Sequence, residues 1–346
     1  MAEQHRLKTS IAILGGAGDV GSTLAYNLIL NPICSEIILV DPKTELLEAQ
    51  VRDLADATFR GQTGARVRTG TAKEAGQADI VVITAGAKQK IGMHIPRLLI
   101  LRSFPSCESR LSLLSRNLHI LSSIFKSMAP INPNTILLLV ANPVDILTYF
   151  ARKLSGLPET QVLGSGTSLD SARLRGILAE KADVAPNSIG AYVLGEHGDS
   201  QFIAWSSVTV GTTPLDLALP NTLTEEFKAE IAEHTRGAAA AIIAKKGCTA
   251  FGIGMIAASI CRFILFDAHT VRPLSFYQPE LGCCLSMPAV IGRKGIIRKM
   301  PVQLNEKEQK DLEECAKNLR GVIEGAEKEL TADEELRKAL EVDKGS

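Results

Sequence analysis

The stretch "SIAILGGAGDVGSTLAYNLI", residues 10–29, decides the fold class. A short apolar run leads into Gly16, Gly18 and Gly21, spaced as G-x-G-x-x-G, and then into apolar residues at helical spacing. Glycines here let the chain turn tightly and let backbone N–H groups approach a pyrophosphate, whose charge the helix N-terminus stabilises. The stretch therefore predicts the first strand, turn and helix of a dinucleotide-binding unit.

An acidic residue after the next apolar run supports this interpretation. Asp41 follows "EIILV" and lies 20 residues after Gly21. A carboxylate there accepts hydrogen bonds from the adenosine ribose and repels a 2′-phosphate, which favours NAD over NADP. The alternative is a glycine-rich turn of purely structural use. The expected cofactor-binding residues of this region are Gly16, Gly18, Asp19, Val20, Gly21 and Asp41.

Beyond this stretch, short runs rich in Ile and Val alternate with helical patterns up to about Gly166. The strand candidates are "SIAIL", "EIILV", "DIVVIT", "TILLLV" and "QVLGSG". Runs that are apolar throughout indicate a parallel sheet covered by helices. We expect an α/β fold: a Rossmann-type doubly wound parallel sheet over residues 1–166, with a lid at 87–111, and a mixed α+β substrate domain over 167–346.

The second half has a different pattern of predicted helices and strands. It mixes a helix, the strand-like alternation "QFIAWSSVTV" and a long Ala-rich helix. We expect that Ala-rich helix to begin with a capping box from Thr222 to Glu225.

Bulk properties exclude several classes of function. The 38 basic and 38 acidic side chains give zero net charge, so no general field favours nucleic acid or an anionic membrane. The seven cysteines contain no C-x-x-C pair, which indicates reduced intracellular thiols and no metal site. The N-terminus lacks the apolar core of a signal peptide, and no segment reaches the roughly 18 apolar residues of a membrane span. We expect a soluble, cytoplasmic protein with a small-molecule partner.

Three side chains in the second half form a chemically meaningful set. His197 lies in "LGEHGDSQ", and Asp170 and Arg173 lie in "GSGTSLDSARLRG". Taken singly, such a His is more often structural and such an Asp more often a helix cap. Together, an imidazole that exchanges a proton near neutral pH, a carboxylate that orients it and a guanidinium fork for a carboxylate suit the reduction of a keto acid.

Several runs in order resemble the L-lactate dehydrogenases of the lactate and malate dehydrogenase superfamily. They are "GAGDVG", "ITAGAKQK", "ESRLSLLSRN", "ANPVDILTY", "LSGLPETQVLGSGTSLDSARLR" and "LGEHGDSQFIAWS", spread over about residues 10–330. The resemblance implies NAD as cofactor, pyruvate and lactate as substrates and a homo-oligomer, with a homotetramer and a homodimer both open.

The resemblance also implies catalytic roles for individual residues. His197 would donate and accept the proton, Asp170 would orient it, and Arg173 would bind the substrate carboxylate. Arg110 would polarise the carbonyl from a mobile lid.

Further residues would complete the substrate and cofactor sites. Asn142 would bind near the reacting carbonyl and the nicotinamide, and Thr249 would line the substrate pocket. Ala85, Gly86 and Lys88 would contact the cofactor, although many relatives have an arginine where this chain has Lys88.

Gln89 corresponds to the position that is glutamine in lactate enzymes and arginine in malate enzymes. A malate enzyme needs a second cation for a second carboxylate, whereas glutamine faces the methyl group of pyruvate without leaving a buried charge unpaired. A malate dehydrogenase or another 2-hydroxy-acid dehydrogenase is the alternative.

The chain departs from the family between Gln89 and Arg110. These residues are 21 positions apart, against six in the family, so the 15 residues from Met93 to Cys107 are additional. Three interpretations are open. The segment loops outward and leaves the lid intact; it displaces Arg110, leaving an NAD-binding protein of impaired activity; or it is an unspliced segment of the gene model.

Overall fold

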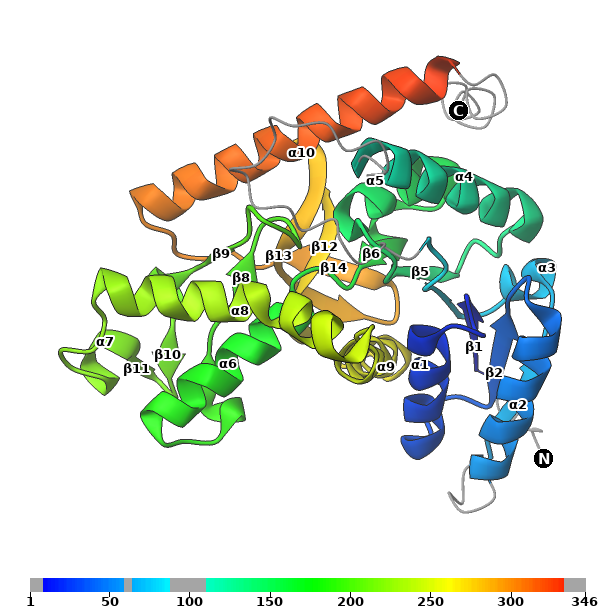
Figure 1. Ribbon diagram of the computed structural model, residues 1–346, viewed down its shortest axis with the longest axis horizontal. Coiled ribbons are helices and arrows are strands. Elements are labelled where there is room, and N and C mark those ends of the chain that lie inside the picture. Colours follow the sequence, from blue (N-terminus) through cyan, green and yellow to red (C-terminus); the bar gives the residue numbers. More distant parts are fainter. Residues whose placement is uncertain (1–8, 59–63, 88–109, 333–346) are drawn as a thin grey trace, which may run out of the picture.

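The computed structural model describes residues 9–58, 64–87 and 110–332, arranged as in Figure 1. Lys88, Gln89 and Met93 to Cys107 lie outside the described residues, as does the side chain of Arg110. The expectations for these positions therefore stay predictions.

A parallel sheet forms the first half of the chain. Its strands lie in the order β3-β2-β1-β4-β5-β6. They are β1 Ser10–Leu14, β2 Glu36–Val40, β3 Arg66–Thr69, β4 Ile80–Ile83, β5 Ile136–Leu139 and β6 Val162–Gly164. This order is that of a Rossmann fold, which confirms the expected fold class.

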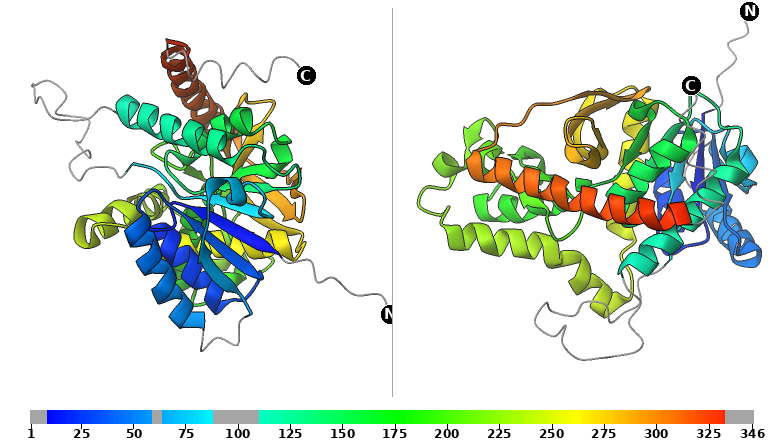
Figure 2. Two further views of the ribbon diagram at one scale, coloured as in Figure 1. Left: turned by 90° about the vertical axis from the view of Figure 1, so that its right-hand side faces the viewer. Right: turned by 90° about the horizontal axis from the view of Figure 1, so that it is seen from above.

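Helices cover both faces of this sheet (Figure 2). They are α1 Asp19–Leu30, α2 Thr44–Thr58, α3 Ala72–Ala75, α4 Arg110–Met128 and α5 Val144–Ser155. Central strands β4 and β5 are buried along their whole length because helices pack on each side. Each fully buried Ile or Leu contributes roughly 1.5–3 kcal/mol to folding, so these runs stabilise the scaffold that carries the site.

The second half of the chain extends the same sheet. Antiparallel strands β12 Thr270–Gln278, β13 Cys283–Gly292 and β14 Gly295–Lys299 continue it, with β12 pairing to β6 through Ser275 and Gly164. The sheet thus has nine strands within the described residues. Two smaller sheets contain β7 Ile189–Gly190, β10 Thr209–Val210 and β11 Thr213–Pro214, and β8 Val193–Leu194 with β9 Phe202–Ile203.

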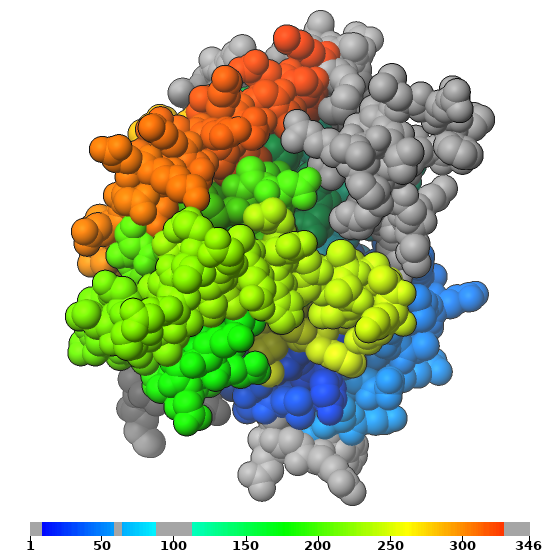
Figure 3. Space-filling model, turned by 60° about the vertical axis from the view of Figure 1, so that its left-hand side comes forward, coloured from blue at the N-terminus to red at the C-terminus, as the bar shows by residue number. Residues whose placement is uncertain are grey.

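The helices of the second half pack around these strands. They are α6 Ser168–Ala182, α7 Leu215–Ala218, α8 Glu225–Lys246, α9 Phe251–Leu265 and α10 Glu306–Ala332. The N-cap of the Ala-rich helix α8 lies two residues later than expected, because the hydroxyl of Thr224, not Thr222, accepts the Phe227 N–H at 3.2 Å. Figure 3 shows α8 in yellow-green and α10 in orange on one face of the molecule.

Candidate active site

The glycine-rich turn connects β1 to α1 with little room for side chains. A Cβ on Gly21 would lie 2.3 Å from the carbonyl oxygen of Gly15, and a Cβ on Gly16 would lie 2.9 Å from the Cβ of Leu39. Gly18 directly precedes the first helical residue, Asp19. The turn therefore brings the backbone and the N-terminus of α1 together in the form that a pyrophosphate needs.

Gly15 is a further residue of this turn, and the G-x-G-x-x-G spacing did not single it out. Its φ is +90°, a left-handed conformation that favours glycine, and a Cβ there would lie 2.7 Å from the backbone nitrogen of Ala85. The doubled glycine in "LGGAG" was the signal available in the sequence.

Asp41 lies at the end of β2, next to this turn. Its carboxylate accepts the Ala17 N–H at 3.3 Å and the Lys43 N–H at 3.0 Å. A carboxylate held beside the glycine-rich turn is in the position expected of a residue that binds an adenosine ribose. The residues present thus fit NAD.

The ends of β4 and β5 are joined by one amide side chain. Asn117 of α4 accepts the Ala87 N–H at 2.7 Å and donates to the carbonyl oxygen of Asn142 at 2.8 Å. Its contacts tie the segment of Ala85 and Gly86 to that of Asn142. Because the carboxyl ends of parallel strands meet at one edge of the sheet, these residues share that edge with the glycine-rich turn.

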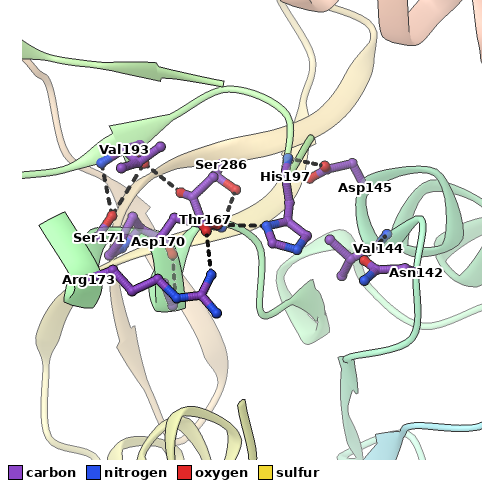
Figure 4. Close-up of polar contacts among 12 residues, drawn as sticks. Asn142, Val144, Asp145, Thr167, Asp170, Ser171, Arg173, Val193, His197 and Ser286 are labelled. Carbon is purple, nitrogen blue, oxygen red and sulfur yellow. Dashed lines mark hydrogen bonds and ion pairs between the residues drawn. The ribbon is translucent and has the colours of Figure 1, made fainter. Parts of the chain in front are cut away.

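His197 and Asp170 form a hydrogen-bonded pair (Figure 4). His197 Nδ1 lies 2.7 Å from Asp170 Oδ2, and the Asp170 side chain is only 3% exposed, against 26% for His197. Burial lowers the pKa of His197, but the hydrogen bond and the charge of Asp170 outweigh it, so the pKa is raised above 6.5. For Asp170, burial raises the pKa of the carboxyl group. The hydrogen bonds and positive charges of His197 and Arg173 lower it by more, so the net shift is downward.

Arg173 is the third member of this group. Its Nη1 donates to Asp170 Oδ1 at 3.1 Å, one helical turn away in α6. Asp170 thus bridges the imidazole and the guanidinium, as Figure 4 shows. The structure brings together the three side chains that the sequence analysis selected.

A buried network holds these residues in register. Thr167, just before α6, donates its N–H to Ser286 Oγ at 3.0 Å, and Ser171 Oγ accepts the Val193 N–H at 2.9 Å. Ser286 also exchanges backbone hydrogen bonds with Gly195, two residues before His197. The start of α6 and the segment carrying His197 are therefore fixed against the same strand, β13.

Asp145, in α5, is a residue that the sequence analysis missed. It is 2% exposed, and its Oδ2 accepts the backbone N–H of His197 at 2.7 Å. Burial raises its pKa to about 6, against the opposing effects of the Ser275 hydroxyl and His197. The only signal in the sequence was its place in "ANPVD", a motif from which Asn142 alone was selected as a site residue.

For two other expected site residues, the structure gives the position in the fold. Thr249 lies half-buried in the connection between α8 and α9. Arg110 is the first residue of α4. Their roles in substrate binding stay predictions.

A separate cavity lies behind the segment that carries His197. It measures about 600 Å³ and is lined by residues of α8 and α10 together with Asp199 and Ser200. His197, Asp170 and Arg173 do not line it. We therefore place the candidate site at the His197 group and not in this cavity.

Over residues 9–58, 64–87 and 110–332, no helix is both long and apolar enough to cross a membrane. In the same part of the chain, no group of three or more His, Cys, Asp or Glu residues is arranged to hold a metal ion.

Comparison with family models gives two matches that together span most of the chain. Residues 9–164 match the lactate/malate dehydrogenase NAD binding domain. Residues 167–330 match the lactate/malate dehydrogenase alpha/beta C-terminal domain.

Comparison with individual proteins agrees. L-lactate dehydrogenase A of Rhizopus oryzae is 45% identical over 320 residues, 91% of this chain and 92% of that protein. L-lactate dehydrogenase 1 of Lactococcus lactis subsp. lactis is 38% identical over 332 residues, 94% of this chain and 96% of that protein.

Solved structures are similar over the same extent. A lactate dehydrogenase enzyme, MGS-M5, from a Medee basin deep-sea metagenome library has a TM-score of 0.84 and 32% identity, covering 92% of this chain and 99% of its own. The minor L-lactate dehydrogenase of Enterococcus mundtii has a TM-score of 0.83 and 32% identity, covering 92% and 98%.

Proposed function

The chain belongs to the lactate/malate dehydrogenase family, and from this premise we propose that it is an NAD-dependent L-lactate dehydrogenase. The reaction is the reversible transfer of a hydride and a proton between NADH and pyruvate, giving L-lactate. The observation that carries the proposal is the chain of contacts from His197 through Asp170 to Arg173.

Substrate binding falls to Arg173 in this proposal. A guanidinium offers two parallel N–H donors to a carboxylate, and the pairing fixes orientation as well as position. Because Arg173 and His197 share Asp170, a keto acid held at the guanidinium has its carbonyl oxygen near the imidazole.

Proton transfer falls to His197. Its Nδ1 is occupied by Asp170, so Nε2 is the nitrogen that faces the substrate. When bound, NADH supplies the hydride that the carbonyl carbon of pyruvate receives. The protonated imidazole gives its Nε2 proton to the carbonyl oxygen as negative charge develops there, and in lactate oxidation the neutral imidazole takes the proton back. The raised pKa of His197 keeps the protonated form available near neutral pH.

Asp41 supports NAD as the cofactor. A carboxylate beside the ribose would repel the 2′-phosphate of NADP, and the contacts of Asp41 with Ala17 and Lys43 hold it there.

A homo-oligomer is part of the proposal. Helices α1 and α9 pack against each other, and their Tyr26, Leu30, Phe251 and Met255 side chains are exposed. Apolar side chains gathered on paired helices suit a contact with a second copy of the chain.

A comparison of pyruvate with oxaloacetate as substrates tests the assignment of pyruvate. We expect kcat/KM with NADH to be higher for pyruvate than for oxaloacetate, because Gln89 offers no cation to the second carboxylate. Gln89→Arg should move the preference towards oxaloacetate. A wild-type preference for oxaloacetate would support a malate enzyme, and an unchanged ratio in the variant would remove Gln89 from the pocket.

A further inference from the structure

The catalytic histidine has a second carboxylate that the proposed reaction does not use. Asp145 contacts the backbone of His197 while Asp170 contacts its ring, so the residue lies between two acids on different helices (Figure 4). Asp145 lies in α5, a helix that follows strand β5 of the parallel sheet, and Asp170 lies in α6.

The surroundings of Asp145 make ionisation of its carboxyl group energetically unfavourable. It is 2% exposed, and within the described residues its Oδ1 has no hydrogen-bond partner of good geometry. An apolar or neutral side chain would cost less there, since an ionised carboxylate is stable in a protein interior only when other groups compensate it.

Among the residues that the structure describes, ionisable groups from three parts of the chain interact with the charge of Asp145. His197 and Glu196 come from the segment after β8, Cys283 and Cys284 from β13, and Cys315 from α10. The pKa values of all three thiols are raised by burial, so the thiols are neutral near pH 7. His197 is then the one group in this set that can be positively charged.

We propose that Asp145 is a positioning residue for the reaction: it fixes the backbone of His197 and, when ionised, adds a second negative charge that favours the protonated imidazole. The inference rests on the proposed function. Asp145 acts on His197 through its field and one backbone hydrogen bond, and it does not touch the reacting atoms.

The sign of the effect follows from the chemistry of the two directions. Pyruvate reduction needs protonated His197, so its rate falls as the pH rises through the pKa of that residue. Lactate oxidation needs the neutral form, so its rate rises over the same interval. Removing a nearby negative charge lowers the pKa of His197 and moves both profiles to lower pH.

Asp145→Asn separates charge from geometry, because the amide oxygen can still accept the His197 N–H. At pH 8 we expect kcat/KM for pyruvate to fall by about 3- to 10-fold, since each pH unit of displacement is a tenfold change in the protonated fraction. At pH 6.5 we expect lactate oxidation to become faster than in the wild type. Asp145→Ala, which removes the acceptor as well as the charge, should show the same displacement of both profiles and, in addition, a lower maximal rate in both directions.

Glu308→Gln is the matched control. Glu308 is also buried and also accepts backbone N–H groups, but these come from Ser206 at 3.0 Å and Asn305 at 3.0 Å and not from His197. Its profiles should coincide with those of the wild type. Profiles of Asp145→Asn that coincide with the wild type, or that fall equally in both directions, would overturn the proposal.

An NMR titration gives a readout without turnover. The imidazole signal of His197, assigned by its absence from a His197→Asn spectrum, should titrate at lower pH in Asp145→Asn than in the otherwise unaltered full chain. Asp145→Ser serves the same purpose if the Asn variant does not fold. If the wild type fails to reduce pyruvate, the proposed function fails while this titration still decides the role of Asp145; equal titration curves would contradict it.

Discussion

Arg173 carries two tasks at the scale of single residues. Its Nη1 contacts Asp170, and the planar fork beyond that contact is suited to a carboxylate. Asp170 is therefore shared by the group that binds the substrate and the group that protonates it. The arrangement explains why a change at position 173 should affect both binding and orientation.

Arg173→Lys tests this dual task. A lysine keeps the charge but cannot form two parallel hydrogen bonds, so we expect kcat/KM for pyruvate to fall by about 100-fold, mainly through KM. Steady-state NADH kinetics measure the change. Arg175→Lys, two residues along the same helix, is the control, because Arg175 donates to the carbonyl oxygen of Ala191 and not to the Asp170 group. Equal losses in the two variants would show that Arg173 has no special role.

Individual residues differed in how visible they were in the sequence. His197, Asp170 and Arg173 could be selected because their chemistry is complementary and their surroundings resemble a family. Asp145 could not, since its contact with His197 joins residues 52 positions apart and depends on how α5 packs beneath the His197 segment. Gly15 was visible only as an extra glycine in "LGGAG", because its close approach is to Ala85, which follows β4 in another part of the chain.

Among the elements, the Ile-, Leu- and Val-rich strands of the first half were predictable, whereas the charged strand at the edge of the sheet was not. Five runs rich in Ile, Leu and Val correspond to β1, β2, β4, β5 and β6. Strand β3, "RVRT", is at the edge of the sheet and alternates charged with other residues, so its hydrophobicity gave no signal. The run "QFIAWSSVTV" contains two short strands, β9 and β10, separated by a turn of 3₁₀ helix at Trp205–Ser207.

The effect of the additional segment from Met93 to Cys107 on activity can be tested by deleting it. We expect its deletion to raise kcat for pyruvate and leave the Kd for NADH unchanged, because it restores the family spacing between Gln89 and Arg110. A misplacement of a catalytic group by about 1 Å can cost on the order of 100-fold in rate. Stopped-flow NADH oxidation and NADH fluorescence titration measure the two quantities.

A variant in which the same 15 positions are replaced by Gly and Ser is the control for length. It should stay slow if length alone displaces Arg110. Unchanged kinetics in the deletion variant would favour a segment that loops outward with the lid intact.

The whole molecule is built around one sheet that runs through both halves. The texture change near Gly166 was visible in the sequence, but the antiparallel pairing of β12 with β6 was not, since Ser275 and Gly164 are 111 residues apart. That continuity matters for the site. Asp145 and Asn142 belong to the parallel half, whereas Asp170, Arg173 and His197 belong to the half that follows, and the shared sheet sets their relative positions.

In the proposed reaction, His197, held by Asp170, exchanges a proton with a keto acid bound at Arg173. The most direct test is NADH oxidation by the full chain with saturating pyruvate, compared with His197→Asn. We predict steady turnover in the wild type and a loss on the order of 100- to 10,000-fold in the variant, with the Kd for NADH unchanged. Binding of NADH without reduction of any 2-keto acid by the wild type, or equal rates for the two proteins, would contradict it.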